Sequence, residues 1–192
     1  MNLSKLILDP PSKICTIDAS TNSIAFAIFN DAKLVKYGKI KFQGKTNYDK
    51  VIDAGRKSFG IFKLFDVDSI VIEHTVFMNS PKTAADLALV QGAILGAAGV
   101  NGIGISGSIN PISWQTFIGN GNLKPLEKKA IIDANPDKSK SWYKQQERQL
   151  RKQRTINFVN TYYDINIDDD DVADAIGVGH YALNNWEKIK KG

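Results

Sequence analysis

One short apolar run contains a carboxylate, and this combination constrains the chain more than any other feature of the sequence. Residues 13–20 read Lys-Ile-Cys-Thr-Ile-Asp-Ala-Ser, a β-branched pattern that predicts a buried strand with Asp18 near its end. A carboxylate inside such a run is costly to bury unless a partner neutralises it, and a metal ion is one such partner. Taken alone, Asp18 fits a second interpretation equally well, because Ser20, Thr21 and Asn22 are typical of a turn after a strand.

The pattern after this run alternates between strands and helices. Residues 23–30 and 33–43 predict two more strands, so the first three strands form an antiparallel meander. We expect further strands at 69–73 and among Gly99, Gly102, Gly104 and Gly107, and helices at 47–65, 81–98, 124–135, 139–162 and 172–186. Residues 111–118 predict a short helix or a turn. Three antiparallel strands followed by parallel ones predict an α/β fold with a mixed five-stranded sheet flanked by helices. This order of elements resembles that of the ribonuclease H-like fold.

The composition indicates one globular domain with a basic surface. The chain has 192 residues, of which 43% are hydrophobic, so we expect a single domain over residues 1–192 with a basic helical segment at 124–162. The net charge of +5 permits a nucleic-acid partner. Cys15 is the single cysteine, which suits a reducing compartment, and we expect a cytoplasmic protein, either the cell's own or virus-encoded and acting in the host cytoplasm.

We expect no membrane partner. No run approaches the roughly 20 apolar residues of a membrane span. The most apolar helical stretch is residues 84–100, where Asp86, Gln91 and three glycines favour a helix buried in a globular core.

Three other acids lie where they could converge on Asp18. Glu73 ends the predicted strand 69–73, and the carboxyl ends of parallel strands in an α/β sheet face ligands. Asp171 and Asp174 are three residues apart and share a helix face. The alternatives are a solvent-exposed edge carboxylate for Glu73 and a helix N-terminal dipole partner for Asp171. Asp170 could also share the face of Asp174.

A set of four carboxylates suits hard divalent cations, which prefer oxygen ligands. We expect Mg²⁺, and two such ions about 4 Å apart can activate a water and stabilise the leaving oxygen of a phosphodiester. Zinc is disfavoured because the chain has one cysteine and no histidine cluster.

Four motifs in order resemble the RuvC family of Holliday junction resolvases, and among them the short resolvases carried by phages. They are Thr16-Ile17-Asp18-Ala19-Ser20, Ile72-Glu73-His74-Thr75-Val76-Phe77-Met78, Ser113-Trp114-Gln115-Thr116-Phe117-Ile118-Gly119 and Asp171-Val172-Ala173-Asp174-Ala175.

The resemblance implies catalytic and metal-binding roles for Asp18, Glu73, Asp171 and Asp174. Phe77 resembles the phenylalanine of the family that stacks near the junction centre. Trp114 occupies the place of one helical Lys or Arg near the scissile phosphate, and Lys124 resembles a second. The resemblance also implies a homodimer that nicks two strands symmetrically with Mg²⁺ or Mn²⁺.

A basic segment precedes the last helix. Residues 138–154 contain seven Lys or Arg and a single Glu, with Trp142 and Tyr143 among them. The seven are Lys138, Lys140, Lys144, Arg148, Arg151, Lys152 and Arg154. Such a run is usually a solvated helix face, but the neighbouring acidic site favours contact with DNA phosphates.

The leading hypothesis is therefore a metal-dependent, structure-selective endonuclease that resolves four-way junctions and other branched DNA by paired nicks. A ribonuclease H that cuts RNA–DNA hybrids is the nearest alternative. An actin-like phosphotransferase is disfavoured, although Asp18-Ala19-Ser20-Thr21 resembles a phosphate loop, because such proteins need two domains and 192 residues are too few. A catalytically silent DNA-binding module is disfavoured by the presence of all four acids.

Overall fold

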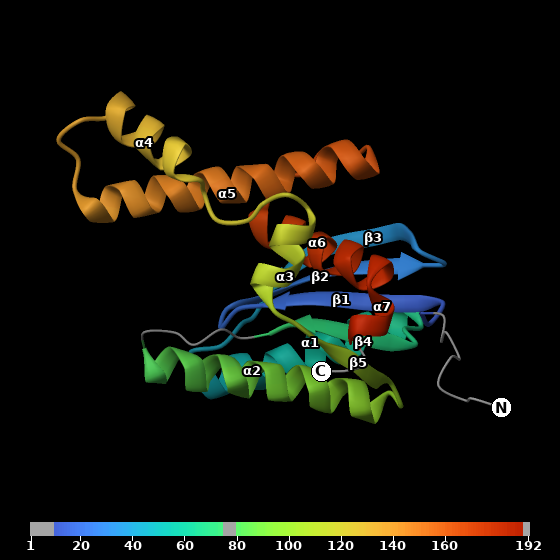
Figure 1. The fold of residues 1–192 in the computed structure, drawn as a ribbon. Coiled ribbons are helices and arrows are strands. Elements are labelled where there is room, and N and C mark those ends of the chain that lie inside the picture. The colour runs from blue at the N-terminus through green and yellow to red at the C-terminus, as the bar shows by residue number, and fades with distance from the viewer. Residues whose placement is uncertain (1–9, 75–79, 190–192) are drawn as a thin grey trace.

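The computed structural model describes residues 10–74 and 80–189 and is built on one mixed sheet. The strands are β1 (Lys13–Ala19), β2 (Ser23–Asn30), β3 (Lys33–Lys41), β4 (Ser69–Glu73) and β5 (Gly104–Ile109). Their order is β3-β2-β1-β4-β5, so β1 lies at the centre (Figure 1). The predicted mixed five-stranded sheet is confirmed, and β3 ends two residues before the predicted boundary at residue 43.

The central strand pairs in two senses. β1 is antiparallel to β2, with Asp18 opposite Ala25, and parallel to β4, with Ile17 opposite Ile72. Asp18 and Glu73 each follow one residue after that last parallel pair. The pairing of β1 with β4 therefore brings the two acids to neighbouring positions at one edge of the sheet.

Helices cover both faces of the sheet (Figure 1). α1 (Asn47–Phe65) and α2 (Pro81–Val100) pack on one face, where Cys15, Ile17 and Ile70 belong to their core cluster. α3 (Pro111–Phe117), α6 (Asp170–Asn184) and α7 (Trp186–Ile189) lie on the other face.

α6 lies unusually close to the sheet. A Cβ atom added at Gly179 would overlap the ring of Phe29 on β2, so glycine at this position permits the approach. The Thr16 hydroxyl also donates a 2.7 Å hydrogen bond to the carbonyl of Ala175 and ties β1 directly to α6. These contacts hold the helix that carries Asp171 and Asp174 against the strand that carries Asp18.

The last predicted helix, 172–186, is wrong at both ends. α6 begins at Asp170 because Asp169 is its N-cap and accepts a hydrogen bond from the Val172 amide at 3.1 Å. α6 ends at Asn184, and α7 starts at Trp186 as a separate short helix.

α4 (Pro125–Ala134) and α5 (Lys140–Tyr163) form a projecting helical pair, here called the arm (Figure 1). The C-terminal half of α5 is anchored, since Thr155, Ile156 and Val159 are buried against the body. The N-terminal half and α4 lie away from the sheet, and α4 has no buried residue. The helical nature of this segment is confirmed, with bounds within two residues of those predicted.

α2 corrects the expectation that no apolar run approaches the length of a membrane span. It is long and apolar enough, by length and composition, to cross a membrane, with a mean hydropathy of 1.5. In the fold it packs beside α1, and Leu87, Val90 and Ile94 lie in the core. Its exposed side carries Leu89, Leu95 and Val100, which makes the whole helix apolar rather than amphipathic.

Candidate active site

The acids predicted from the sequence line one cavity of about 330 Å³ at the carboxyl ends of β1 and β4. Side chains alternate along a strand, so Asp18 shares the α6-facing side with Thr16, and Glu73 shares it with Val71. α6 lies over this face and brings Asp171 and Asp174 to the same cavity. Asp170, held open as an alternative, also lines it.

Asp18 and Glu73 are close enough to share a proton. Burial, the nearby charges of Glu73 and Asp171, and a hydrogen bond with the Glu73 carboxyl raise the pKa of Asp18 well above its usual range. Burial raises the pKa of Glu73 to about 7, and the charge of Asp174 adds to this rise. A pair of neighbouring, half-buried acids therefore holds a proton near neutral pH.

Asp174 completes the buried acidic group. Burial raises its pKa well above the usual range, and the charges of Asp18, Asp170 and Asp171 raise it further, whereas Lys152 opposes the rise. Repulsion among these acids destabilises the charged forms, and cations at the site would relieve it.

Two lysines already neutralise part of the site. Lys39 on β3 contacts Asp171 at 2.6 Å and Asp169 at 3.0 Å. Lys152 on α5 forms an ion pair with Asp170. Sequence reasoning missed Lys39, because its partners lie 130 residues or more away along the chain and no local pattern marks it.

Trp114 does not lie where a phosphate contact would need it. Its side chain is fully buried, and its indole Nε1 donates a 2.8 Å hydrogen bond to Oε1 of Glu73. At the place where the resemblance implies a basic residue in the family, Trp114 thus supports an acid of the cavity from inside the core. Gln91 on α2 adds a second contact and donates to the Glu73 carbonyl at 3.2 Å.

The donor set fits hard divalent cations by its chemistry. The five acids that line the cavity offer carboxylate oxygens, and their negative charge is relieved by a shared proton and two lysine ammonium groups in the metal-free chain. Within residues 10–74 and 80–189, no three His, Cys, Asp or Glu side chains are already gathered tightly enough to hold an ion. A bound ion would thus take the place of the proton and draw the carboxylates together.

The basic residues predicted to bind DNA fall into three groups. Lys124, Lys138, Lys140 and Lys144 are exposed on the arm. Arg148 and Lys152 line the acidic cavity itself. Arg151 and Arg154 are turned inward, toward Gln115 and Glu127 respectively, so they do not point to the cavity with Arg148 and Lys152. Phe77 lies outside the described residues.

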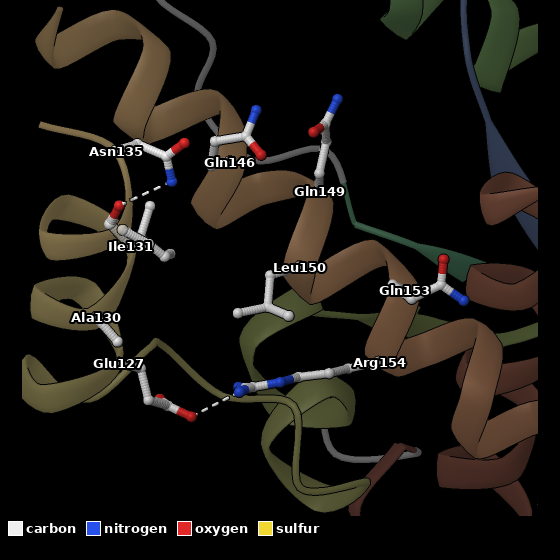
Figure 2. A pocket seen from close by; sticks show the side chains of 10 residues that line it. Glu127, Ala130, Ile131, Asn135, Gln146, Gln149, Leu150, Gln153 and Arg154 are labelled. Atoms are coloured by element: carbon white, nitrogen blue, oxygen red, sulfur yellow. Dashed lines mark hydrogen bonds and ion pairs between the residues drawn. The ribbon is translucent and has the colours of Figure 1, made fainter. Parts of the chain in front are cut away.

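A larger cavity, of about 640 Å³, lies between α4 and α5, away from the acids (Figure 2). Ile131 and Leu150 form an apolar floor, and Gln146 and Gln149 stand along its α5 side. The 2.5 Å ion pair between Arg154 and Glu127 crosses one end. Among its lining residues no cluster of acids or nucleophiles occurs, so this groove carries no candidate chemistry.

Glu73→Gln should stabilise the metal-free protein at pH 8 and reduce the pH dependence of its stability. The pKa of Glu73 rises from the usual 4.5 to about 7 on folding, so its contribution to stability is present below 4.5 and is lost as the pH rises through about 7. Urea denaturation in EDTA at several pH values measures this slope. The control is Glu187→Gln, a change to an exposed glutamate of α7. Equal slopes for wild type and Glu73→Gln would contradict a raised pKa of Glu73 in the folded protein.

Comparison with known proteins finds a partial sequence match and several structures of the same fold. No protein-family model matches the chain. A crossover junction endodeoxyribonuclease RuvC from Aliarcobacter butzleri is 31% identical over 86 residues, which are 43% of this chain and 56% of that protein. The chain is thus matched over little more than half the length of this curated relative.

Solved structures agree on the fold. RuvC from Thermus thermophilus superposes with a TM-score of 0.63 at 12% identity, covering 92% of this chain and 97% of the other. The T. thermophilus RuvC in complex with a Holliday junction substrate gives 0.61 at 14% identity, covering 91% and 97%. The yeast mitochondrial Holliday junction resolvase Ydc2 gives 0.54 at 12% identity, covering 97% and 83%. These likenesses show that the chain has the ribonuclease H-like fold of the RuvC resolvases, and the partial sequence match lies within the same kind of protein.

Proposed function

We propose that this protein is a metal-dependent endonuclease that resolves four-way DNA junctions by paired nicks. The single observation that carries the proposal is the cavity in which Asp18, Glu73, Asp171 and Asp174 meet beside Arg148 and Lys152. Acids that suit divalent cations and bases that suit phosphates line the same space. The similarity to RuvC proteins supports DNA junctions as the substrate.

The four predicted acids would hold the divalent cations. We propose two Mg²⁺ ions per site, with Mn²⁺ able to substitute, and Asp170 as an alternative to Asp171. Bound ions of this kind activate a water and stabilise the leaving oxygen of a phosphodiester. The chain's own contribution is to keep Asp18, Glu73 and Asp174 in a partly buried cavity, where repulsion favours exchange of the shared proton for metal.

Arg148 and Lys152 would bind the phosphate that is cut. They lie one helical turn apart on α5 and line the acidic cavity. Arg148 is exposed and forms no ion pair within the described part of the chain, so its guanidinium is free to bind a phosphate with two hydrogen bonds. Lys152 would leave its ion pair with Asp170 and bind the phosphate instead.

The arm would extend the DNA-binding surface beyond the site. Lys138, Lys140 and Lys144 are exposed near the start of α5, and Lys124 precedes α4. Long, exposed lysines suit sequence-independent contact with the phosphate backbone. Arg151 and Arg154 would instead keep the arm in place through Gln115 and Glu127. Phe77 stays a proposed contact at the junction centre.

We propose that the protein acts as a homodimer through α1 and α2. Both helices expose apolar side chains, including Ile52, Leu89 and Val100, which are 62%, 46% and 79% exposed. A shallow groove of about 270 Å³ between them reaches from Phe59 to Gly96. A four-way junction offers two equivalent strands, and a two-fold dimer matches that symmetry.

Residues 1–192 would form one nuclease domain that acts on DNA inside the cell. The buried, unpaired thiol of Cys15 suits a reducing cytoplasm.

Asp18→Asn should bind a four-way junction as wild type does and cleave it at least about 100-fold more slowly, because losing one ligand disrupts ion binding. Glu73→Gln and Asp174→Asn should behave alike. Gel assays with a four-way junction, an RNA–DNA hybrid and a linear duplex, each with and without Mg²⁺, measure binding and cleavage. Asp133→Asn, an exposed position on α4, is the control. Faster cleavage of the hybrid than of the junction would favour a ribonuclease H instead.

Replacing Lys138, Lys140 and Lys144 by Gln should weaken binding to every branched DNA to a similar degree. The slope of log affinity against log salt should flatten by roughly 0.9 for each phosphate on a duplex arm that a lysine no longer neutralises. Fluorescence anisotropy at several salt concentrations measures the slope. A control with equal charge loss replaces Lys33, Lys36 and Lys63, which are exposed on β3 and α1. An unchanged slope in the arm variant would leave these lysines as a solvated surface.

Leu89→Glu with Leu95→Glu should convert the dimer to a monomer. Both side chains are exposed on α2, at 46% and 39%, so the monomer should keep its fold while charge repels the partner helix. Analytical ultracentrifugation at micromolar concentration measures the mass. Leu126→Glu on α4, where the side chain is 80% exposed, is the control that should remain dimeric. A wild-type monomer that still cleaves junctions would refute the dimer.

A further inference from the structure

The fully buried Trp114 donates a hydrogen bond to an acid of the candidate active site. A buried indole N–H usually finds a hydrogen-bond acceptor. Here the acceptor is Oε1 of Glu73, at 2.8 Å, an acid of the cavity itself. Trp114 itself does not line the cavity, so it contacts the site only through this carboxylate.

The indole is held in place from the side opposite the sheet. A Cβ atom added at Gly177 on α6 would lie 2.6 Å from Cζ3 and 2.9 Å from Cε3 of Trp114, so the ring fills the space that glycine leaves. Ile14 of β1 and Val71 of β4 belong to the same buried cluster. Helix and sheet together fix the direction of the Nε1–H bond, and α3 supplies the side chain.

Trp186 provides an internal comparison. It belongs to the same buried cluster and is 5% exposed. Its Nε1 is buried and has no hydrogen-bond partner among the described residues. Of these two indoles of one cluster, Trp114 bonds to an acid of the site and Trp186 does not.

We propose that Trp114 is a positioning residue that fixes the Glu73 carboxylate for metal binding, with Gly177 as the seat of its ring. The proposal rests on the proposed metal-dependent activity. A hydrogen bond to one carboxylate oxygen limits rotation of the group and leaves the other oxygen directed to a ligand. A donor of this kind also favours the charged carboxylate, which is the form that binds a metal ion.

The test measures Mn²⁺ binding to the DNA-free protein by electron paramagnetic resonance. Trp114→Phe keeps an aromatic ring in the core and removes the donor, and we expect Mn²⁺ affinity to fall by about 10-fold. Trp186→Phe makes the same chemical change in the same cluster and should leave the affinity unchanged. Gly177→Ala should displace the indole and lower the affinity as well, and adding it to Trp114→Phe should have little further effect, since the smaller ring leaves room.

A second readout separates positioning from general damage. Urea denaturation is expected to show similar loss of stability in Trp114→Phe and Trp186→Phe, while only the first needs more Mn²⁺ for half-maximal cleavage. Saturating Mn²⁺ should restore most of the cleavage rate of Trp114→Phe.

The two proposals fail in different ways. Equal Mn²⁺ affinity in wild type and Trp114→Phe, or equal losses in both Phe variants, would overturn the role of Trp114. A wild type that binds Mn²⁺ more tightly than Trp114→Phe and yet cleaves no junction would overturn the proposed function and leave the positioning role intact. A wild type that binds no Mn²⁺ would overturn both.

Discussion

The confinement of negative charge at one edge of the sheet is the constraint on which the rest of the structure depends. Parallel pairing of β1 with β4 brings Asp18 beside Glu73, and α6 adds Asp174 above them. Repulsion and burial oppose this arrangement, so other parts of the fold offset it. Lys39 comes from β3, Lys152 from α5 and the indole of Trp114 from α3, and each reaches an acid of the cluster or its immediate neighbour. Distant segments of the chain are thus linked through one acidic group.

The arm is connected to the same group. α5 is a single helix with two different halves: Ile156 and Val159 pack into the body, whereas the N-terminal half stands free of the sheet. Arg148 and Lys152 lie between these halves and reach the cavity. Because a helix transmits its orientation along its length, the packing at one end sets the direction of the lysines at the other. The direction of the exposed arm lysines and the placement of Arg148 and Lys152 at the cavity therefore depend on one helix.

Local chemistry makes the frame of this protein predictable from its sequence. The β-branched run around Asp18 and the apolar residues before Glu73 predict two adjacent buried strands, and the three-residue spacing of Asp171 and Asp174 predicts a shared helix face. Contacts between distant residues cannot be predicted in this way. Lys39 gives no local signal, Arg151 and Arg154 look like exposed bases in sequence, and the motif around Trp114 does not reveal that its indole bonds to Glu73. In each case the partner lies 27 or more residues away, so tertiary placement decides the contact.

The outer strand β3 discourages further pairing. It carries Lys33, Lys36, Lys39 and Lys41 within nine residues, and positive charge on an edge strand opposes the approach of another strand. At the other end of the sheet, a Cβ atom at Gly107 would lie 2.6 Å from Ile189, so α7 packs tightly on the face of β5. The lysines of β3 therefore make β-type aggregation through that edge unfavourable in a chain that exposes the apolar side of α2.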